Sequence, residues 1–376
     1  MQILKLTDKV VFTADCQLKR RTWANRTNIT DDPIAGYRQV IDHAIAHNAD
    51  VVIAGDFFDT QWPDTHTMRQ VDTENNRLRA KGRNVYGIVG NHDMSTGLLE
   101  TGDPETSWYA FVGIIPLNKR IVHFAGVNWY ALDWIRNPKE EVAKTPANCT
   151  GLIIHQLFEG IVPTFIAHNI TPADVPQHVQ RVLVGDFHQR LVRKLDHLEI
   201  HSPGSTYLCK IDEDPVKACT LISPGPLGPV YGDLALKTRQ VVRCTVLTDG
   251  DLQSTIDLLR QVDDNPDCPP GCETSILHVK FSPLLKEVES RIKAACPPNV
   301  YPMLEKLVLD EDGKPVDANT ADDGQAFSYD PSDILPGVMS AADDQAAFDF
   351  TLGLLTTANP MEFIRQQRAK FGAEKQ

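Results

Sequence analysis

Several features of membrane and secreted proteins are absent from this sequence. No apolar run approaches the roughly 20 residues that a membrane-spanning helix needs. The N-terminal segment, MQILKLTDKVVFTAD, passes directly into a strand-like pattern and has no small-residue cleavage site. We therefore expect neither a membrane segment nor a signal peptide, and a cytoplasmic location.

Clustered cysteines and positive net charge are also lacking. The eight cysteines are scattered, and the closest pair, Cys268 and Cys272, has no second pair or histidine cluster at zinc spacing. We expect reduced thiols and no structural zinc. The formal net charge of −13 argues against a protein that coats nucleic acid through bulk electrostatics. A local basic rim is compatible with that charge, and its candidates are Lys19, Arg20, Arg21 and Arg26.

The composition that remains is typical of a soluble globular protein. The 376 residues are 42% hydrophobic and 23% charged, enough for two or three domains. Helical spacing occurs at 34–48 and 64–82, and strand-like runs occur at 9–15, 49–56 and 84–91. Further strands are expected within 120–134, 151–156, 181–188 and 194–205. This alternation predicts an α/β sandwich.

The pattern changes after about residue 206. Residues 212–234 and 262–273 are rich in proline, glycine and aspartate, which predicts loops. Strand and helix patterns around them predict a small α+β domain. We expect four parts, which are a main domain over 1–235, a small domain over 236–309, a linker over 310–339 and a helical tail over 340–376.

Five short segments share one feature, an apolar strand that ends in side chains able to bind a metal ion. A single polar residue after a strand is ordinarily a turn former or a helix cap. Five such segments in order are much harder to explain in that way, because strand ends in an α/β fold are where sites form. The segments are TADCQ with Asp15 and Gln17, GDFFD with Asp56 and Asp59, GNHD with Asn91, His92 and Asp93, LIIHQ with His155, and GDFH with Asp186 and His188.

In this order the motifs resemble those of the calcineurin-like metallophosphoesterases. The stretches VVIAGDFFDT, VYGIVGNHD and HSPGST resemble in particular the SbcD-like DNA repair nucleases. The superfamily resemblance covers about residues 9–206. It implies a metallophosphoesterase β-sandwich flanked by helices, and the nuclease resemblance adds a small α+β capping domain that binds DNA and a helical C-terminal tail.

The resemblance implies a pair of metal ions, Mn²⁺ or alternatively Mg²⁺. One ion would be held by Asp15, Gln17, Asp56 and His188, and the other by Asp56, Asn91, His155 and Asp186. Asp56 would bridge them, because a carboxylate between two cations offsets their repulsion. A water held between the ions would then attack phosphorus in line.

His92 would not be a ligand in a protein of this family. It would face the scissile phosphate, where it could stabilise the transition state or protonate the leaving oxygen. Asp59 occupies the family's position for a carboxylate that orients this imidazole. Asp93 is expected to support the loop that carries His92.

Two positions depart from the family pattern. Gln17 stands where the family usually has histidine, and Asp186 replaces the first histidine of G-H-x-H. Oxygen ligands favour Mn²⁺ or Mg²⁺ over ions that prefer nitrogen. A neutral amide binds weakly, so Gln17 either ligates directly or acts through a water.

A basic and aromatic segment directly follows the first motif. Arginine beside an aromatic ring suits contact with phosphates and stacking on bases. The alternative is a solvated loop with a packed tryptophan. The candidate nucleic-acid contacts are Arg20, Arg21, Trp23 and Arg26.

The leading hypothesis is a manganese-dependent DNA nuclease, an exonuclease with or without endonuclease action, that acts in repair, recombination or replication. The resemblance implies a partner, an SMC-type ATPase of the SbcC kind bound by the C-terminal helices, and a homodimer. One alternative is a stand-alone phosphodiesterase on nucleotides or cyclic nucleotides. The other is a non-catalytic scaffold whose site has decayed at Gln17 and Asp186. The compact motifs suit a bacterial or phage protein.

Overall fold

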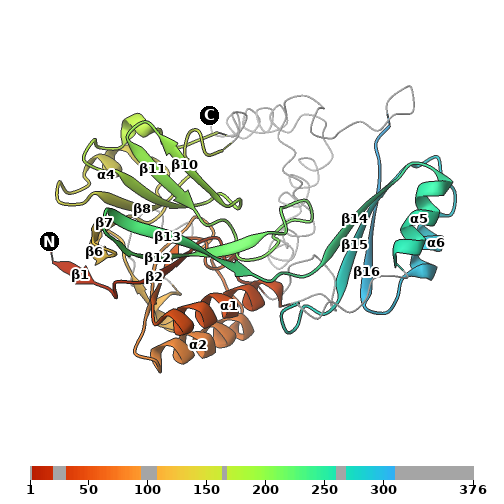
Figure 1. Ribbon diagram of the computed structural model, residues 1–376, viewed down its shortest axis with the longest axis horizontal. Coiled ribbons are helices and arrows are strands. Elements are labelled where there is room, and N and C mark those ends of the chain that lie inside the picture. Colours follow the sequence, from red (N-terminus) through yellow and green to blue (C-terminus); the bar gives the residue numbers. More distant parts are fainter. Residues whose placement is uncertain (1, 20–30, 95–107, 163–166, 260–267, 310–376) are drawn as a thin grey trace, which may run out of the picture. The chain divides into compact units, whose positions relative to one another are not determined.

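The computed structural model describes residues 2–19, 31–94, 108–162, 167–259 and 268–309. Contacts group residues 1–315 into one compact unit and residues 316–376 into a second. The second unit, the linker predicted over 310–339 and the tail helices predicted over 340–376 lie outside the described residues. The described part contains a seven-stranded, a six-stranded and a three-stranded sheet (Figure 1).

The two larger sheets pack face to face as a sandwich. The seven-stranded sheet consists, in order, of β1 (Ile3–Lys5), β6 (Arg120–Phe124), β7 (Val127–Ala131), β8 (Gly151–His155), β9 (Arg181–Gly185), β11 (Leu198–Ser202) and β10 (Leu191–Leu195). The six-stranded sheet consists of β13 (Gly228–Leu236), β12 (Lys217–Gly225), β2 (Val10–Thr13), β3 (Asp50–Ala54), β4 (Val85–Ile88) and β5 (Ile114–Pro116). Strands β2, β3 and β4 are parallel, as are β8 and β9.

The continuous apolar sequence of β3 follows from burial on both of its faces. Val52 and Ala54 belong to the core between the two sheets, which also contains residues of β8 and β9. Val51 and Ile53 point the other way and pack in a core with α1 (Asp32–His47) and α2 (Thr65–Arg79). Figure 1 shows these two helices side by side against the six-stranded sheet. The predicted α/β sandwich flanked by helices is confirmed.

Local sequence signals set the ends of the two long helices. Asp64 caps α2, since its carboxylate accepts hydrogen bonds from the backbone amides of His66 and Thr67, both at 3.0 Å. Asn48 ends α1 in the left-handed conformation, which asparagine tolerates better than most residues. Shorter helical segments are η2 (Ala110–Val112), α4 (Lys139–Ala143) and η3 (Pro172–Asp174).

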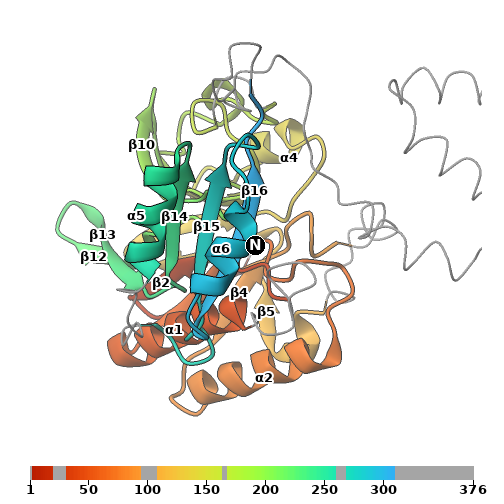
Figure 2. The same cartoon turned by 90° about the vertical axis from the view of Figure 1, so that its right-hand side faces the viewer.

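The third sheet follows the sandwich in the chain. It is parallel and contains β14 (Val241–Val246), β15 (Ser275–Phe281) and β16 (Val300–Lys306). Helices α5 (Asp249–Leu259) and α6 (Val288–Ala295) lie side by side on one face of it (Figure 2). The predicted strands and helices after residue 236 are therefore present, but the strands are parallel and alternate with the helices, so the arrangement is α/β rather than α+β. The capping and DNA-binding roles remain predictions.

The prediction of a loop over 212–234 was wrong for most of its length. Strands β12 and β13 form a long antiparallel hairpin there, and β12 pairs with β2 in the sandwich. Proline and glycine concentrate at the turn end, where Pro224 faces Pro229 and Gly225 faces Gly228. That end extends beyond the pairing with β2, so the prolines interrupt no central ladder.

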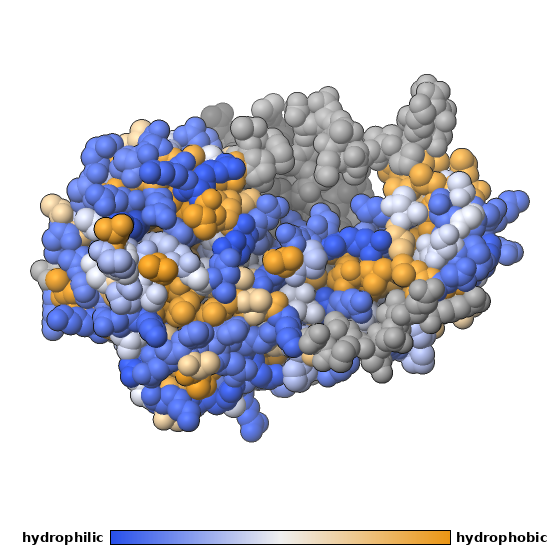
Figure 3. Space-filling model, viewed as in Figure 1, coloured by the Kyte–Doolittle hydropathy of each residue, from blue (hydrophilic) through white to orange (hydrophobic). Residues whose placement is uncertain are grey.

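The described surface is mainly polar. On the face in Figure 3, hydrophilic side chains predominate and hydrophobic ones occur in small groups among them. Among the described residues, no helix is both long and apolar enough to cross a membrane.

Candidate metal centre

The strand ends of the sandwich bring the predicted ligands together. Asp15 and Gln17 follow β2, Asp56 follows β3 and Asn91 follows β4, all in the six-stranded sheet. His155 ends β8 in the opposite sheet, and β3 contacts β8 and β9 across the sandwich. Ligand atoms of Asp15, Asp56 and His155 lie within 4.8 Å of one another. Residues from both sheets thus converge at one edge of the sandwich.

The backbone at this edge is held in an uncommon conformation. Asp15, Gln17, Asp56 and Asp186 have positive φ angles of 48°, 38°, 47° and 83°. Residues with side chains rarely adopt such angles, and where they do, the surrounding structure must compensate for the strain. Four of the predicted site residues share this feature. They are four of the ten non-glycine residues with a positive φ among the described residues.

The glycines of the motifs leave the space that the site side chains fill. A Cβ atom at Gly55 would lie 2.4 Å from Nδ1 of His155, and one at Gly185 would lie 2.6 Å from the same atom. A Cβ atom at Gly90 would lie 2.1 Å from Oδ1 of Asp56. No side chain fits at these distances. The repeated pattern of glycine before a polar residue therefore has a steric cause.

The ring of His155 is the clearest evidence for a cation. Its Nδ1 lies 2.6 Å from the carbonyl oxygen of Ala54, which can only accept, so Nδ1 carries a proton. Its Nε2 faces Oδ1 of Asn91 at 3.1 Å and Oδ1 of Asp56 at 3.3 Å. Oδ1 of Asp186 lies 3.9 Å from the same nitrogen. A lone pair among three oxygens is repulsive, so Nε2 either carries a second proton or faces a cation, and this donor set fits a divalent ion.

The electrostatics of the buried carboxylates favour the same conclusion. Burial raises the pKa of Asp15 to about 6, although His155 opposes that shift. Burial also acts to raise the pKa of Asp56, but the adjacent His155 outweighs it, and this pKa lies below its usual value. Burial would lower the pKa of His155, yet Asp56 and its neighbours hold it well above the usual value. Without an ion, the imidazole therefore carries a second proton on Nε2, at the position that a metal ion would take.

The remaining ligand candidates form two further contacts, one of Asp186 with Asp15 and one of Gln17 with His188. The backbone amide of Asp186 donates to both carboxylate oxygens of Asp15, at 3.1 and 3.2 Å. The side-chain amide nitrogen of Gln17 lies 3.1 Å from Nε2 of His188. The Gln17 amide would therefore have to turn before its oxygen could bind an ion. Direct ligation by Gln17 stays a prediction.

His92 lies beside the buried cluster with 43% of its side chain exposed. Its backbone amide donates to Oδ1 of Asp56 at 2.9 Å, and Nδ1 lies 3.0 Å from the carbonyl oxygen of Asp59. Nδ1 is therefore the donor, and Nε2 is left for an outside partner. The expected pairing with the Asp59 carboxylate was wrong, because that carboxylate forms an ion pair with Lys19 at 2.9 Å.

Asp93 supports the loop around His92, as predicted. Its buried carboxylate accepts hydrogen bonds from the backbone amides of Phe58 at 2.7 Å and Gly90 at 3.0 Å, and from the hydroxyl of Tyr109 at 2.7 Å. These bonds join the loops after β3 and β4. They fix the position of His92 relative to Asp56.

Sequence reasoning missed two residues that support this region. Glu213 lies 3.1 Å from Nδ1 of His188, and Asp133 accepts the backbone amide of Val89 at 2.9 Å. Burial raises the pKa of Asp133 to about 7. Nothing in the sequence around either residue distinguishes it from other acidic residues in loops. The nucleic-acid candidates Arg20, Arg21, Trp23 and Arg26 lie outside the described residues.

Comparisons with known proteins agree with the motif order. The family model of the calcineurin-like phosphoesterases matches residues 8–190. The DNA double-strand break repair protein Mre11 of Methanosarcina mazei is 23% identical over 259 residues, which are 65% of this chain and 40% of that protein. The protein of the same name from Methanosarcina acetivorans is 24% identical over 266 residues, which are 65% of this chain and 41% of that protein.

The chain therefore spans about two fifths of the length of these curated relatives. Among solved structures, an archaeal phosphodiesterase has 13% sequence identity and a TM-score of 0.34, covering 61% of this chain and 99% of that chain.

Proposed function

We propose that this chain, whose residues 8–190 match the family model of the calcineurin-like phosphoesterases, is a metal-dependent nuclease that hydrolyses phosphodiester bonds in DNA. The observation that carries the proposal is the Nε2 atom of His155, which faces oxygens of Asp56, Asn91 and Asp186. The DNA substrate is supported by the curated relatives, whose names describe DNA double-strand break repair.

We assign two ions to the centre. The first would be held by Asp15, Gln17, Asp56 and His188, and the second by Asp56, Asn91, His155 and Asp186. When bound, such ions supply Lewis-acid stabilisation and an activated water. The buried strand ends hold Asp15, Asp56 and His155 in place, and the half-exposed His92 lies beside them. In its doubly protonated form, with Nδ1 still donating to the Asp59 carbonyl oxygen, His92 would donate a proton from Nε2 to the departing oxygen.

The choice of metal should follow the ligand atoms. Of the eight proposed ligand positions, only His155 and His188 offer nitrogen, so we expect the highest activity with Mn²⁺, followed by Mg²⁺. Digestion of end-labelled single- and double-stranded DNA with Mn²⁺, Mg²⁺, Zn²⁺ or EDTA measures this directly. EDTA should abolish cleavage. Zinc as the best activator, with manganese inert, would contradict the assignment.

The same assay separates the alternatives. A parallel reaction with cyclic nucleotides and bis(p-nitrophenyl) phosphate, under the same metal conditions, reports small-molecule phosphodiesterase activity. Cleavage of these compounds without cleavage of either DNA would favour the nucleotide phosphodiesterase. No hydrolysis of any substrate with any of the metals would favour a non-catalytic scaffold.

The proposal extends to a partner on the basis of sequence alone. The resemblance to SbcD-like nucleases suggests an SMC-type ATPase that binds residues 340–376, and a homodimer. Those residues lie outside the described part of the chain. Co-purification of the full chain with a candidate ATPase, compared with a chain that ends at residue 324, examines that contact.

A further inference from the structure

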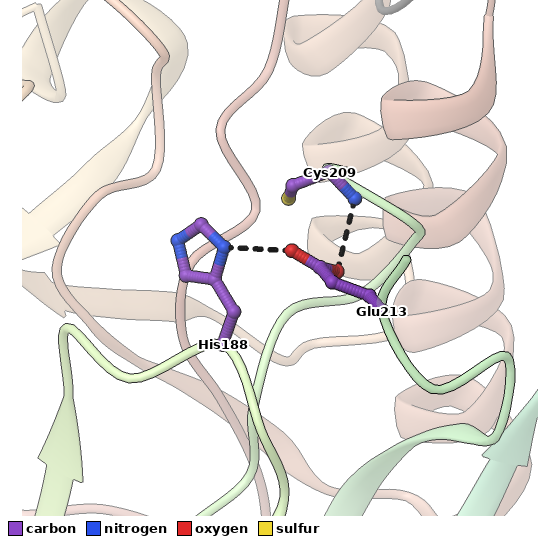
Figure 4. Close-up of side chains that lie close together, drawn as sticks. All are labelled: His188, Cys209 and Glu213. Carbon is purple, nitrogen blue, oxygen red and sulfur yellow. Dashed lines mark hydrogen bonds and ion pairs between the residues drawn. The ribbon is translucent and has the colours of Figure 1, made fainter. Parts of the chain in front are cut away.

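A second cluster of ligand-type side chains adjoins the proposed centre. It consists of His188, Cys209 and Glu213, whose ligand atoms lie within 4.8 Å of one another (Figure 4). His188 belongs to the proposed metal centre, whereas Glu213 has no role in it. The cluster places a carboxylate at Nδ1 of the imidazole, which leaves Nε2 as the nitrogen that would bind the ion.

Both neighbours of the His188 ring require the same tautomer. Nδ1 lies 3.1 Å from Oε1 of Glu213, a carboxylate oxygen that accepts the Nδ1 proton. Nε2 lies 3.1 Å from the amide nitrogen of Gln17, which donates to an unprotonated Nε2. The neutral ring therefore has its proton on Nδ1 and its lone pair on Nε2. That is the state in which Nε2 can bind a metal ion.

Glu213 is itself held by a buried cation. Its side chain is 9% exposed, and that of Lys217 is 5% exposed. Nζ of Lys217 lies 2.8 Å from Oε2 of Glu213 and donates to the hydroxyl of Ser205 at 2.8 Å. The backbone amide of Cys209 donates to the same carboxylate oxygen at 3.1 Å. Oε2 is thus held by Lys217, the Cys209 amide and, at 3.4 Å, the Ser205 hydroxyl, which leaves Oε1 for His188.

We propose that Glu213 is a positioning residue that fixes the ring orientation and tautomer of His188 for metal binding. The proposal rests on the proposed function, since it assigns Glu213 to the same metal centre. A carboxylate that accepts the distal N–H of a ligating histidine typically contributes 10–100-fold to metal affinity. Lys217 balances the charge that Glu213 brings into the interior.

The cluster could instead hold an ion of its own. The charge arrangement opposes that reading, because the ammonium group of Lys217 lies only 2.8 Å from Glu213 and would repel a cation at the carboxylate. The Nδ1 proton of His188 also occupies the position such an ion would need. Cys209 donates its backbone amide to Glu213, and its side chain hydrogen-bonds to His188.

The test is Mn²⁺ binding by isothermal titration calorimetry on the full chain. Wild-type protein should bind two ions. Glu213→Gln should bind one of them roughly 10–100-fold more weakly and leave the other unchanged. Cleavage of DNA by Glu213→Gln should recover as Mn²⁺ is raised, because the ring still reaches the site once the ion is supplied in excess.

A control pair lies on β11. His201 and Glu199 form another histidine–glutamate pair, also at 3.1 Å, and neither residue belongs to the centre. Glu199→Gln removes the same charge from the same kind of contact. It should leave both Mn²⁺ affinities and the metal dependence of cleavage unchanged.

A second variant covers the case in which Glu213→Gln destabilises the fold by leaving Lys217 buried without a counter-charge. Glu213→Gln combined with Lys217→Met removes both charges and should fold, as thermal melting without metal would report. It should show the same weakened ion. Wild-type affinities in a folded Glu213→Gln or double variant would overturn the proposal. A third Mn²⁺ ion that binds wild-type protein but not Cys209→Ser would overturn the proposal in favour of a separate site. Wild-type protein that binds no Mn²⁺ would refute the proposed function itself.

Discussion

Replacing Asp56 with alanine is expected to abolish metal binding and DNA cleavage together. Its buried carboxylate is the proposed bridge between the two ions, and Oδ1 also lies 3.3 Å from Nε2 of His155. Without the bridge, the two ions repel each other and each loses a ligand. Metal ions contribute several kcal/mol of transition-state stabilisation, so cleavage should fall by roughly 10³-fold or more. Calorimetry and metal analysis measure the binding, and end-labelled DNA measures the cleavage.

Asp50 offers a control on the same strand. It is also a buried carboxylate, but it stands at the opposite end of β3, where it accepts the backbone amides of Thr7 at 2.8 Å and Asn84 at 2.9 Å. Asp50→Ala should lower the free energy of unfolding by about 1–3 kcal/mol, because buried donors lose their acceptor. It should leave both Mn²⁺ affinities intact. Full metal binding by Asp56→Ala would refute the bridge.

Replacing His92 with alanine should separate chemistry from metal binding. The ring contacts the carbonyl oxygen of Asp59 through Nδ1, and no metal role is assigned to it. We expect both ions to bind with wild-type affinity while kcat falls by roughly 10²-fold or more, the usual contribution of a general acid. Metal content and single-turnover cleavage, measured on the same preparation, report the two properties.

The control for this variant is His66→Ala, which removes an exposed imidazole from the start of α2. It should cleave DNA at the wild-type rate. Loss of metal from His92→Ala would show that the imidazole, rather than the backbone amide that bonds to Asp56, holds the centre together. That outcome would remove the proposed proton-donor role.

The strand-end residues were predictable because the local pattern of apolar and polar residues agrees with the fold at these positions. A short apolar run such as residues 51–54, followed by glycine, is typical of a buried strand, and the polar residue after it is then expected at the edge of the sheet. The glycine before Asp56 or Asp186 signals a close approach that the structure explains by the ring of His155. Composition and spacing therefore indicated both the sandwich and its site.

Other features depend on contacts that spacing does not encode. Strand β12 was missed because proline and glycine at its turn end dominate the local pattern. The strand that it pairs with, β2, also lies more than 200 residues away in sequence. The Asp59 carboxylate forms an ion pair with Lys19, and which neighbour it contacts is set by the fold rather than by the local sequence. Glu213 stands between two aspartates in the sequence, so its contact with His188 has no local signal.

The central claim is that the strand-end residues hold two ions bridged by Asp56. Anomalous difference density from a crystal soaked in Mn²⁺ tests it most directly. The account predicts two peaks roughly 3.5–4 Å apart on either side of the Asp56 carboxylate. One peak should contact Asp15 and His188, and the other should contact Asn91, His155 and Asp186. A single peak, or a pair of peaks that does not share Asp56, would contradict it.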